Sequence, residues 1–263
     1  MVAYLSTDCF DHLYRKIECT SADIAQLRKS VYGRGLSMPV GLQVLEELLL
    51  NRRASPQELV ARVKLTLSLA SIRRMVKPCD QLVADDIRSY AATGQPDRPL
   101  VSAQIQNAIT QGIAELIESD GEEFSEDITE VLEHTRQSKE TFLQTIEASR
   151  QQIVTFADTL PSGIPFTDFL ERFATPMIER SASLAGVLDQ CRERGLDTLL
   201  QIKSVRASVA VMLSVIYGEI FEGWPPTSDA RASFLHVPAA AAIADVFVTD
   251  EFRLRAAVER VAL

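Results

Sequence analysis

The sequence predicts an α/β protein, in which a parallel sheet flanked by helices is interrupted by a large all-helical insertion. Over residues 1–90, short apolar segments alternate with helical patterns, the order expected of parallel strands covered by helices. Helical periodicity alone then continues to about residue 226. A strand pattern, DVFVT at residues 245–249, returns near the end. These three observations define the expected architecture.

The first elements follow from apolar spacing and from residues that start or stop helices. The apolar residues 2–5 predict a buried strand, and residues 10–17 predict the helix after it. Thr20 begins a second helix, which Gly33 ends. Ser55-Pro56-Gln57-Glu58 is a capping box with proline at the first helical position, so another helix starts there. The remaining expected elements are strands at 36–40 and 71–77 and helices at 42–49, 55–69 and 80–90.

Beyond residue 93 the pattern changes, because Gly94, Pro96 and Pro99 interrupt it. A helix that is apolar nearly all round, expected at 196–221, is typical of the buried member of a bundle. We therefore expect an α/β domain of residues 1–99 and 227–263 and a helical insertion of residues 100–226. The other elements expected here are helices at 102–117, 125–156, 166–194, 230–244 and 251–258, a strand at 245–249 and an edge strand at 260–263.

Composition narrows the class of protein. The 263 residues are 46% hydrophobic, enough for a substantial core, and the net charge of −9 argues against broad non-specific binding to nucleic acid. The N-terminus lacks the basic start of a signal peptide, and the longest charge-free apolar stretch, 207–218, is too short to cross a membrane. Four scattered cysteines predict neither zinc nor disulfides, so we expect a cytoplasmic protein.

A local basic segment leaves RNA as a candidate binding partner despite the negative net charge. It could hold a phosphate backbone, or it could be a solvated helix face. The segment consists of Arg52, Arg53, Arg62, Lys64, Arg73, Arg74 and Lys77.

Carboxylates follow two of the predicted strands and lie near a third. Thr7-Asp8 follows the first strand and Thr249-Asp250 follows the last, while Glu46 and Glu47 are on the helix after the second strand. Open parallel sheets place their sites at the carboxyl ends of strands, and Mg²⁺ or Mn²⁺ prefers oxygen ligands. The pattern thus indicates a magnesium or manganese site.

These motifs resemble those of the PIN-domain family of metal-dependent ribonucleases. The family pattern is a strand ending Asp-Thr-Asn, Glu-Leu on a helix after the second strand, an Asp near the penultimate helix, and a strand ending Val-Thr-x-Asp. In this chain the corresponding positions are Ser6-Thr7-Asp8, Glu47-Leu48, Ser233 and Val248-Thr249-Asp250. The resemblance covers roughly the first 90 and last 35 residues and implies a PIN-like fold and hydrolysis of RNA with bound Mg²⁺ or Mn²⁺.

Two of the four family carboxylates are serines here, Ser6 and Ser233. On an extended strand Asp8 would share the face of Ser6, and Asp229 lies one helical turn before Ser233. The acids could therefore form a displaced cluster, supported by Ser6, Thr7, Glu46, Ser233 and Thr249. Alternatively, with only Glu47 and Asp250 intact, the activity would be weakened or lost. The displaced cluster would contain Asp8, Glu47, Asp229 and Asp250.

Other roles fit the same residues. Asp8 could cap the first helix, Asp250 could cap the last, and one of Glu46 and Glu47 is expected to face solvent. The functional alternatives are a non-catalytic binding or scaffold protein that works through the helical insertion, and the toxin of a toxin–antitoxin pair. The helices at 125–156 and 196–221 could form a homodimer or pack on each other.

Overall fold

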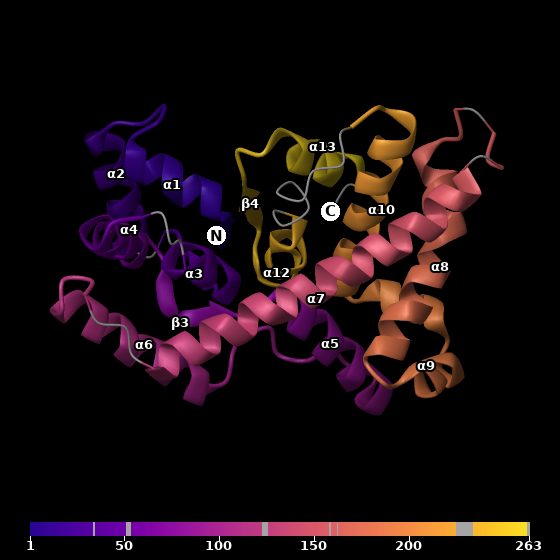
Figure 1. The fold of residues 1–263 in the computed structure, drawn as a ribbon, viewed down its shortest axis with the longest axis horizontal. Coiled ribbons are helices and arrows are strands. Elements are labelled where there is room, and N and C mark those ends of the chain that lie inside the picture. The colour runs from indigo at the N-terminus through magenta and orange to yellow at the C-terminus, as the bar shows by residue number, and fades with distance from the viewer. Residues whose placement is uncertain are drawn as a thin grey trace. The chain divides into compact units, whose positions relative to one another are not determined.

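The structure is a computed structural model that describes residues 1–33, 35–50, 54–122, 126–157, 159–161, 163–224 and 234–261. Helices make up 72% of it, and the strands form a small parallel sheet. The α/β prediction is correct at this level, with far more helix than strand. Figure 1 shows the elements in chain order.

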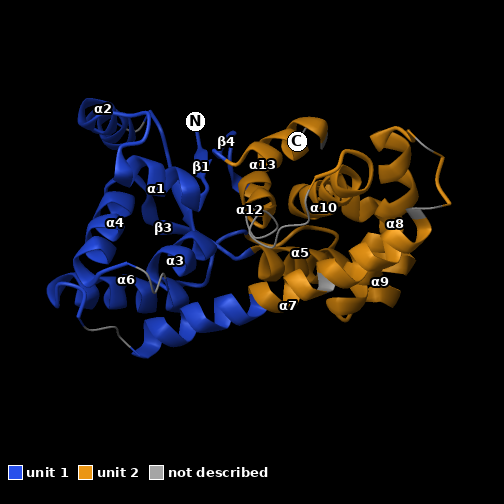
Figure 2. Cartoon of the chain, turned by 45° about the horizontal axis from the view of Figure 1, so that its top comes forward, with its two compact units in different colours: residues 1–78, 99–138, 243–250 blue, residues 79–98, 139–242, 251–263 orange. Residues whose placement is uncertain are grey.

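The chain forms two compact units, each assembled from three segments (Figure 2). We call the first the sheet unit, since it holds every strand described, and the second the helical unit. The sheet unit consists of Met1–Pro78, Pro99–Ser138 and Ile243–Asp250, and the helical unit of Cys79–Arg98, Lys139–Ala242 and Glu251–Leu263.

Short parallel strands organise the sheet unit. β1 (Ala3–Leu5) pairs with β4 (Val246–Val248), and β2 (Pro39–Gly41) pairs with β3 (Ser71–Val76). A parallel bridge between Val2 and Ser37 joins the two pairs, so the strand order is β3-β2-β1-β4. All four strands overlap a strand that the sequence predicts, but each is shorter than expected, and β2 extends one residue past the predicted end at residue 40.

Two helices of the sheet unit begin where the capping residues Thr20 and Ser55 predict. The Thr20 hydroxyl accepts from the backbone N–H of Asp23, whose carboxylate accepts in return from the N–H of Thr20. Ser55 caps the helix that starts at Pro56, as predicted. The helices of this unit are α1 (Thr7–Arg15), α2 (Ser21–Tyr32), α3 (Leu42–Leu49), α4 (Pro56–Leu69), α6 (Ala103–Glu118) and the first part of α7 (Glu126–Ala157).

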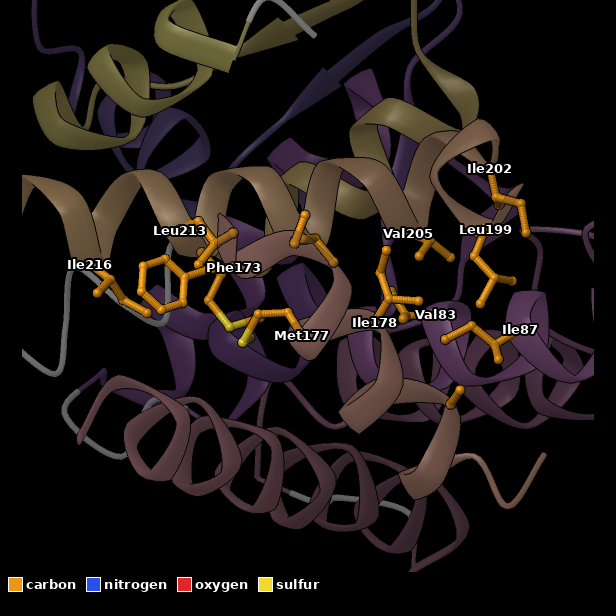
Figure 3. Packing of buried hydrophobic residues seen from close by; sticks show 14 of the residues in the cluster. Val83, Ile87, Phe173, Met177, Ile178, Leu199, Ile202, Val205, Leu213 and Ile216 are labelled. Atoms are coloured by element: carbon orange, nitrogen blue, oxygen red, sulfur yellow. The ribbon is translucent and has the colours of Figure 1, made fainter. Parts of the chain in front are cut away.

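The helical unit is built around one hydrophobic core. Figure 3 shows Phe173 and Ile178 packed among residues such as Val205, Leu213 and Ile87, and Ile178 is fully buried. The helices of this unit are α5 (Cys79–Thr93), the rest of α7, α8 (Phe166–Leu184), α9 (Leu188–Arg194), the 3₁₀ helix η1 (Leu196–Gln201), α10 (Lys203–Phe221), α12 (His236–Ile243) and α13 (Phe252–Val261).

α10 is the central helix of that core, as its apolar composition predicts. It is long and apolar enough to cross a membrane by these two criteria alone, yet most of it is buried inside the protein. A buried core helix satisfies the same criteria, so the composition of α10 is accounted for by its packing.

Arg260 of the C-terminal helix α13 connects this helix to other parts of the helical unit. The guanidinium of Arg260 makes two hydrogen bonds to the Glu222 carboxylate, at 2.6 and 2.7 Å. It also lies 5.1–5.5 Å from the ring centres of Phe166, Tyr217 and Trp224. Residues 260 and 261 continue this helix, where an edge strand was predicted. Residues 262 and 263 of that predicted strand lie outside the described residues.

Two long helices predicted from the sequence are in fact divided. The helix expected at 166–194 ends at Leu184, because Gly186 adopts φ +76°, a conformation that interrupts a right-handed helix. The helix expected at 196–221 begins as η1 and becomes α-helical only from Lys203. Both errors arise from apolar spacing that continues across a change of direction in the backbone.

The compact units also differ from the predicted domains. α5 was assigned to residues 1–99, but its buried residues belong to the core of the helical unit. Conversely, residues 100–138 were assigned to the insertion but belong to the sheet unit, where the N–H of Val101 donates to the carbonyl of Met75 at 3.0 Å. The division therefore follows packing rather than the order of helices and strands.

Gly112 should resist substitution by alanine. In an open helix that change adds about 0.5–1 kcal/mol of stability. Here a Cβ at position 112 of α6 would lie 2.7 Å from the Cβ of Ile128, a buried residue of α7 in the same unit. We expect Gly112→Ala to lower the free energy of unfolding by about 1–3 kcal/mol, measured by denaturant titration.

Ala114 provides the matched control, because it is an exposed position on the same helix. Ala114→Gly should lose only about 0.5–1 kcal/mol, the intrinsic cost of glycine in a helix. A stabilising effect of Gly112→Ala would contradict the close packing of α6 on α7.

Candidate functional site at the ends of β1 and β4

The predicted site residues meet at one edge of the sheet. Because β1 and β4 are parallel and paired in register, their carboxyl ends emerge side by side. Ser6 follows β1 directly, and Thr249 and Asp250 follow β4. α1 begins at Thr7, so its first turn lies at the same edge.

Ser6 is fully buried and directs its polar groups to the neighbouring strand. Its backbone N–H and its hydroxyl both donate to the carbonyl of Val248, each at 3.1 Å. The Cys9 thiol donates to the same carbonyl at 3.4 Å. Ser6 therefore acts in the structure as a neutral link between β1 and β4.

Asp8 joins the start of α1 to the segment after β4. Its Oδ2 accepts from the backbone N–H of Asp250 at 2.7 Å and from the hydroxyl of Thr249 at 3.4 Å. The argument that Asp8 shares a face with Ser6 on an extended strand is wrong, because the helix begins at Thr7 and side chains no longer alternate there. Asp8 nevertheless reaches the end of β4 from the first turn of the helix.

Glu47 belongs to a neighbouring network. Its carboxylate accepts from the Thr7 hydroxyl and, at 3.2 Å, from the side-chain amide of Gln43. Glu46 is only 3% exposed and Glu47 is half-buried, so Glu47 is the more accessible of the pair and neither is fully exposed to solvent. The reason is that α3 is buried on nearly all sides.

Asp250 directs its carboxylate toward α1. Its Oδ2 lies 3.4 Å from Nδ1 of His12, and this carboxylate is 61% exposed. Asp250 does not cap the last helix, since the Glu251 carboxylate accepts from the backbone N–H of Leu254 in that role. His12 was missed as a site residue. Its place one helical turn after Asp8 was the available signal, but nothing local indicated Asp250 as its partner.

The structure thus brings together some of the predicted cluster. Asp8, Thr249 and Asp250 are directly connected, and Glu47 accepts from the hydroxyl of Thr7, the residue before Asp8. Asp229 and Ser233 lie outside the described residues.

Few oxygen donors among the described residues at this edge are available to the Mg²⁺ or Mn²⁺ that the family resemblance implies. In the part of the chain that the structure describes, no three acidic, histidine or cysteine side chains are grouped so as to hold a metal ion. The end of β1 carries a neutral hydroxyl, and Asp8 already accepts two protein hydrogen bonds. These residues do not fit a divalent cation on their own, because too few anionic oxygens converge to replace its water.

The predicted basic segment is partly occupied within the protein. Arg62 is only 7% exposed, and its guanidinium lies 2.7 Å from the Asp11 carboxylate and 2.6 Å from that of Glu58. Arg74 donates to the Ser37 hydroxyl at 2.9 Å. Arg52 and Arg53 fall outside the described ranges. At least two of the seven basic residues are thus engaged in internal contacts.

Comparison of the chain with protein-family models, curated proteins and solved structures gives no match.

Cys9 should be an unreactive thiol. Burial raises its pKa from 9.0 to about 11, and the nearby carboxylates of Asp8 and Asp250 add to the shift. Near pH 8 a thiol of pKa about 11 is ~0.1% thiolate, against ~10% at 9.0, so we expect alkylation by iodoacetamide to be about 100-fold slower than in the unfolded chain.

Mass spectrometry of the Cys9 peptide measures this rate, with the same protein in concentrated guanidinium chloride as the control. Because the thiolate is the reactive form, the folded rate should rise about tenfold for each pH unit below 11. Equal rates in the folded and unfolded chains would contradict the described surroundings of Cys9.

Proposed function

We propose that the sheet unit is a PIN-like domain and that the chain is a divergent ribonuclease of this type, with phosphodiester hydrolysis weakened by the loss of two ligand carboxylates. The observation that carries the proposal is the edge where β1 and β4 end. The Ser-Thr-Asp segment after β1 and the Thr-Asp segment after β4 meet there through the Asp250 N–H and the Asp8 carboxylate. The parallel strand order supports the same assignment.

Ser6 supports the weakening. It stands where the related nucleases have a carboxylate, and its hydroxyl donates to the Val248 carbonyl. Without that carboxylate, the acids of the edge offer fewer charges to offset the dehydration of a cation. Asp8 and Asp250 would in addition repel the phosphates of RNA unless a cation screens them. We therefore infer that RNA engages this edge only when divalent cations are abundant.

A non-catalytic binding protein is the second candidate. The observation in its favour is that Asp8 and Glu47 each accept a hydrogen bond from the protein itself, and that the Asp250 carboxylate lies 3.4 Å from Nδ1 of His12. Such carboxylates serve the structure of the edge and need no ion between them. In that case the chain would retain the PIN-like fold and bind RNA or protein without hydrolysis.

Restoring the missing carboxylate tests the proposal. Ser6→Asp places a buried charge against the Val248 carbonyl, so in EDTA it should lower the free energy of unfolding by about 2–3 kcal/mol. Millimolar Mn²⁺ should recover that loss, because a ligand that binds only the folded state stabilises it. Thermal unfolding with and without Mn²⁺ measures both effects.

Cleavage of a mixed RNA pool completes the experiment. We expect at most trace Mn²⁺-dependent cleavage by the natural chain, at least tenfold faster cleavage by the Ser6→Asp, Ser233→Asp double variant, and loss of that cleavage when Asp250→Asn is added. The matched control is Ser6→Asn, which has similar size but no charge. Mn²⁺ stabilisation of the double variant without cleavage by any variant would favour the binding protein. If Mn²⁺ neither stabilises the double variant nor supports RNA cleavage by it, the PIN-like assignment fails.

A further inference from the structure

A cavity of about 460 Å³ lies on one face of the β1–β4 pair, within the sheet unit. Its floor is the sheet itself. Ala3 pairs with Val246 and Leu5 pairs with Val248, and alternate residues of a strand share a face, so these four side chains point the same way. All four line the cavity.

Aliphatic side chains form the walls. Leu13 of α1, Ile17 after it and Leu27 of α2 face the strands across the cavity. Ile17, Val246 and Val248 are 40–42% exposed, which leaves apolar surface of β4 and of the segment after α1 open to water. The volume lies in the range of small-molecule sites, about 300–1,000 Å³. By contrast, a cavity beside α10 in the helical unit holds only about 30 Å³, room for a single water.

One end of the cavity is charged. His12, Thr249 and Asp250 line it there. Asp8 lies directly behind them, since its carboxylate accepts from both Thr249 and the Asp250 N–H. The carboxylates of Asp8 and Asp250 outnumber the single imidazole of His12. This end therefore carries a net negative charge whether that imidazole is neutral or protonated. The raised pKa of Cys9, another lining residue, is due first to burial and in part to the same two carboxylates.

We propose that this cavity binds a small organic cation, namely a molecule with an aliphatic body and a protonated amine. The body would occupy the space over Ala3, Leu5 and Val248, and the ammonium group would face the Asp250 carboxylate. Apart from the His12 imidazole, no aromatic ring is among the described residues that line the cavity, which favours an alkyl chain or saturated ring over a stacked base. Because Asp250 is well exposed, burial of the body would supply most of the affinity and the charge would supply the orientation.

A series of alkylammonium chlorides tests the proposal on the full chain, in EDTA and without RNA, so that the outcome is independent of the proposed nuclease activity. Isothermal titration should show Kd falling roughly three- to fourfold for each added methylene from butyl to octyl, the effect of burying one CH₂. Hexanoate should bind at least tenfold more weakly than hexylammonium. Equal binding of the two would overturn the proposal.

Variants locate the site. Val248→Phe fills the cavity while the carbonyl that Ser6 uses remains, and it should weaken hexylammonium binding at least tenfold. The matched control is Val154→Phe, a similarly exposed valine of α7 in the helical unit. Asp250→Asn should weaken binding about two- to fivefold, as expected of an exposed ion pair. Its control is Asp189→Asn, which removes an exposed carboxylate of the helical unit.

Methyl NMR of the unmodified protein locates the binding site without any substitution, so the proposal is tested even if a variant does not fold. Hexylammonium is expected to shift the methyl signals of Ala3, Leu5 and Val248. Shifts confined to other residues, or unchanged binding by Val248→Phe, would overturn the assignment of the cavity.

Discussion

The parallel pairing of β1 with β4 is the constraint on which the sheet unit depends. It joins Leu5 to Val248 across more than 240 residues of chain. The Val248 carbonyl accepts from the amide and hydroxyl of Ser6 and from the Cys9 thiol. These bonds fix the start of α1 against the end of β4, and they thereby place Asp8 and His12 beside Asp250. The same strand pair forms the floor of the apolar cavity.

Ser6 shows how the chemistry of this edge differs from that of a metal site. A carboxylate at the end of β1 would face the Val248 carbonyl, and without a cation the two oxygens would repel each other. A hydroxyl can donate to that carbonyl, so the edge is stable with the protein's own groups. The remaining acids are held in the same manner: Asp8 accepts a backbone N–H, and Glu47 accepts from Gln43 and Thr7. The hydrogen bonds within the protein and the binding of a cation thus compete for the same carboxylate oxygens.

Local signals in the sequence predict much of the fold. Thr20 and Ser55 mark helix starts because capping acts within three residues, and DVFVT marks β4 because alternation and composition agree there. The predicted helix and strand bounds are wrong where the apolar pattern of the sequence continues but the backbone conformation changes. Gly186 ends α8 although apolar spacing continues, and Thr7 begins a helix where the strand pattern was extended to Asp8.

The site was predicted only in part for a different reason. The residues at the strand ends were identifiable, because parallel strands bring their carboxyl ends to one edge. The partners of those residues were not, since the contact of His12 with Asp250 depends on tertiary packing between positions far apart in sequence. The same holds for the units: α5 follows the strands in sequence, but Val83 and Ile87 are buried with α8 and α10.

The discontinuous units also set the order of events during synthesis. Each unit requires residues after Ala242, so neither can be completed early on the ribosome. At ~5–20 residues per second, β1 waits about 12–50 s for β4 after it has been made. During that interval the apolar face of Ala3 and Leu5 lacks the strand that later pairs with it. The first strand of the sheet can thus pair with β4 only after more than 240 further residues have been made.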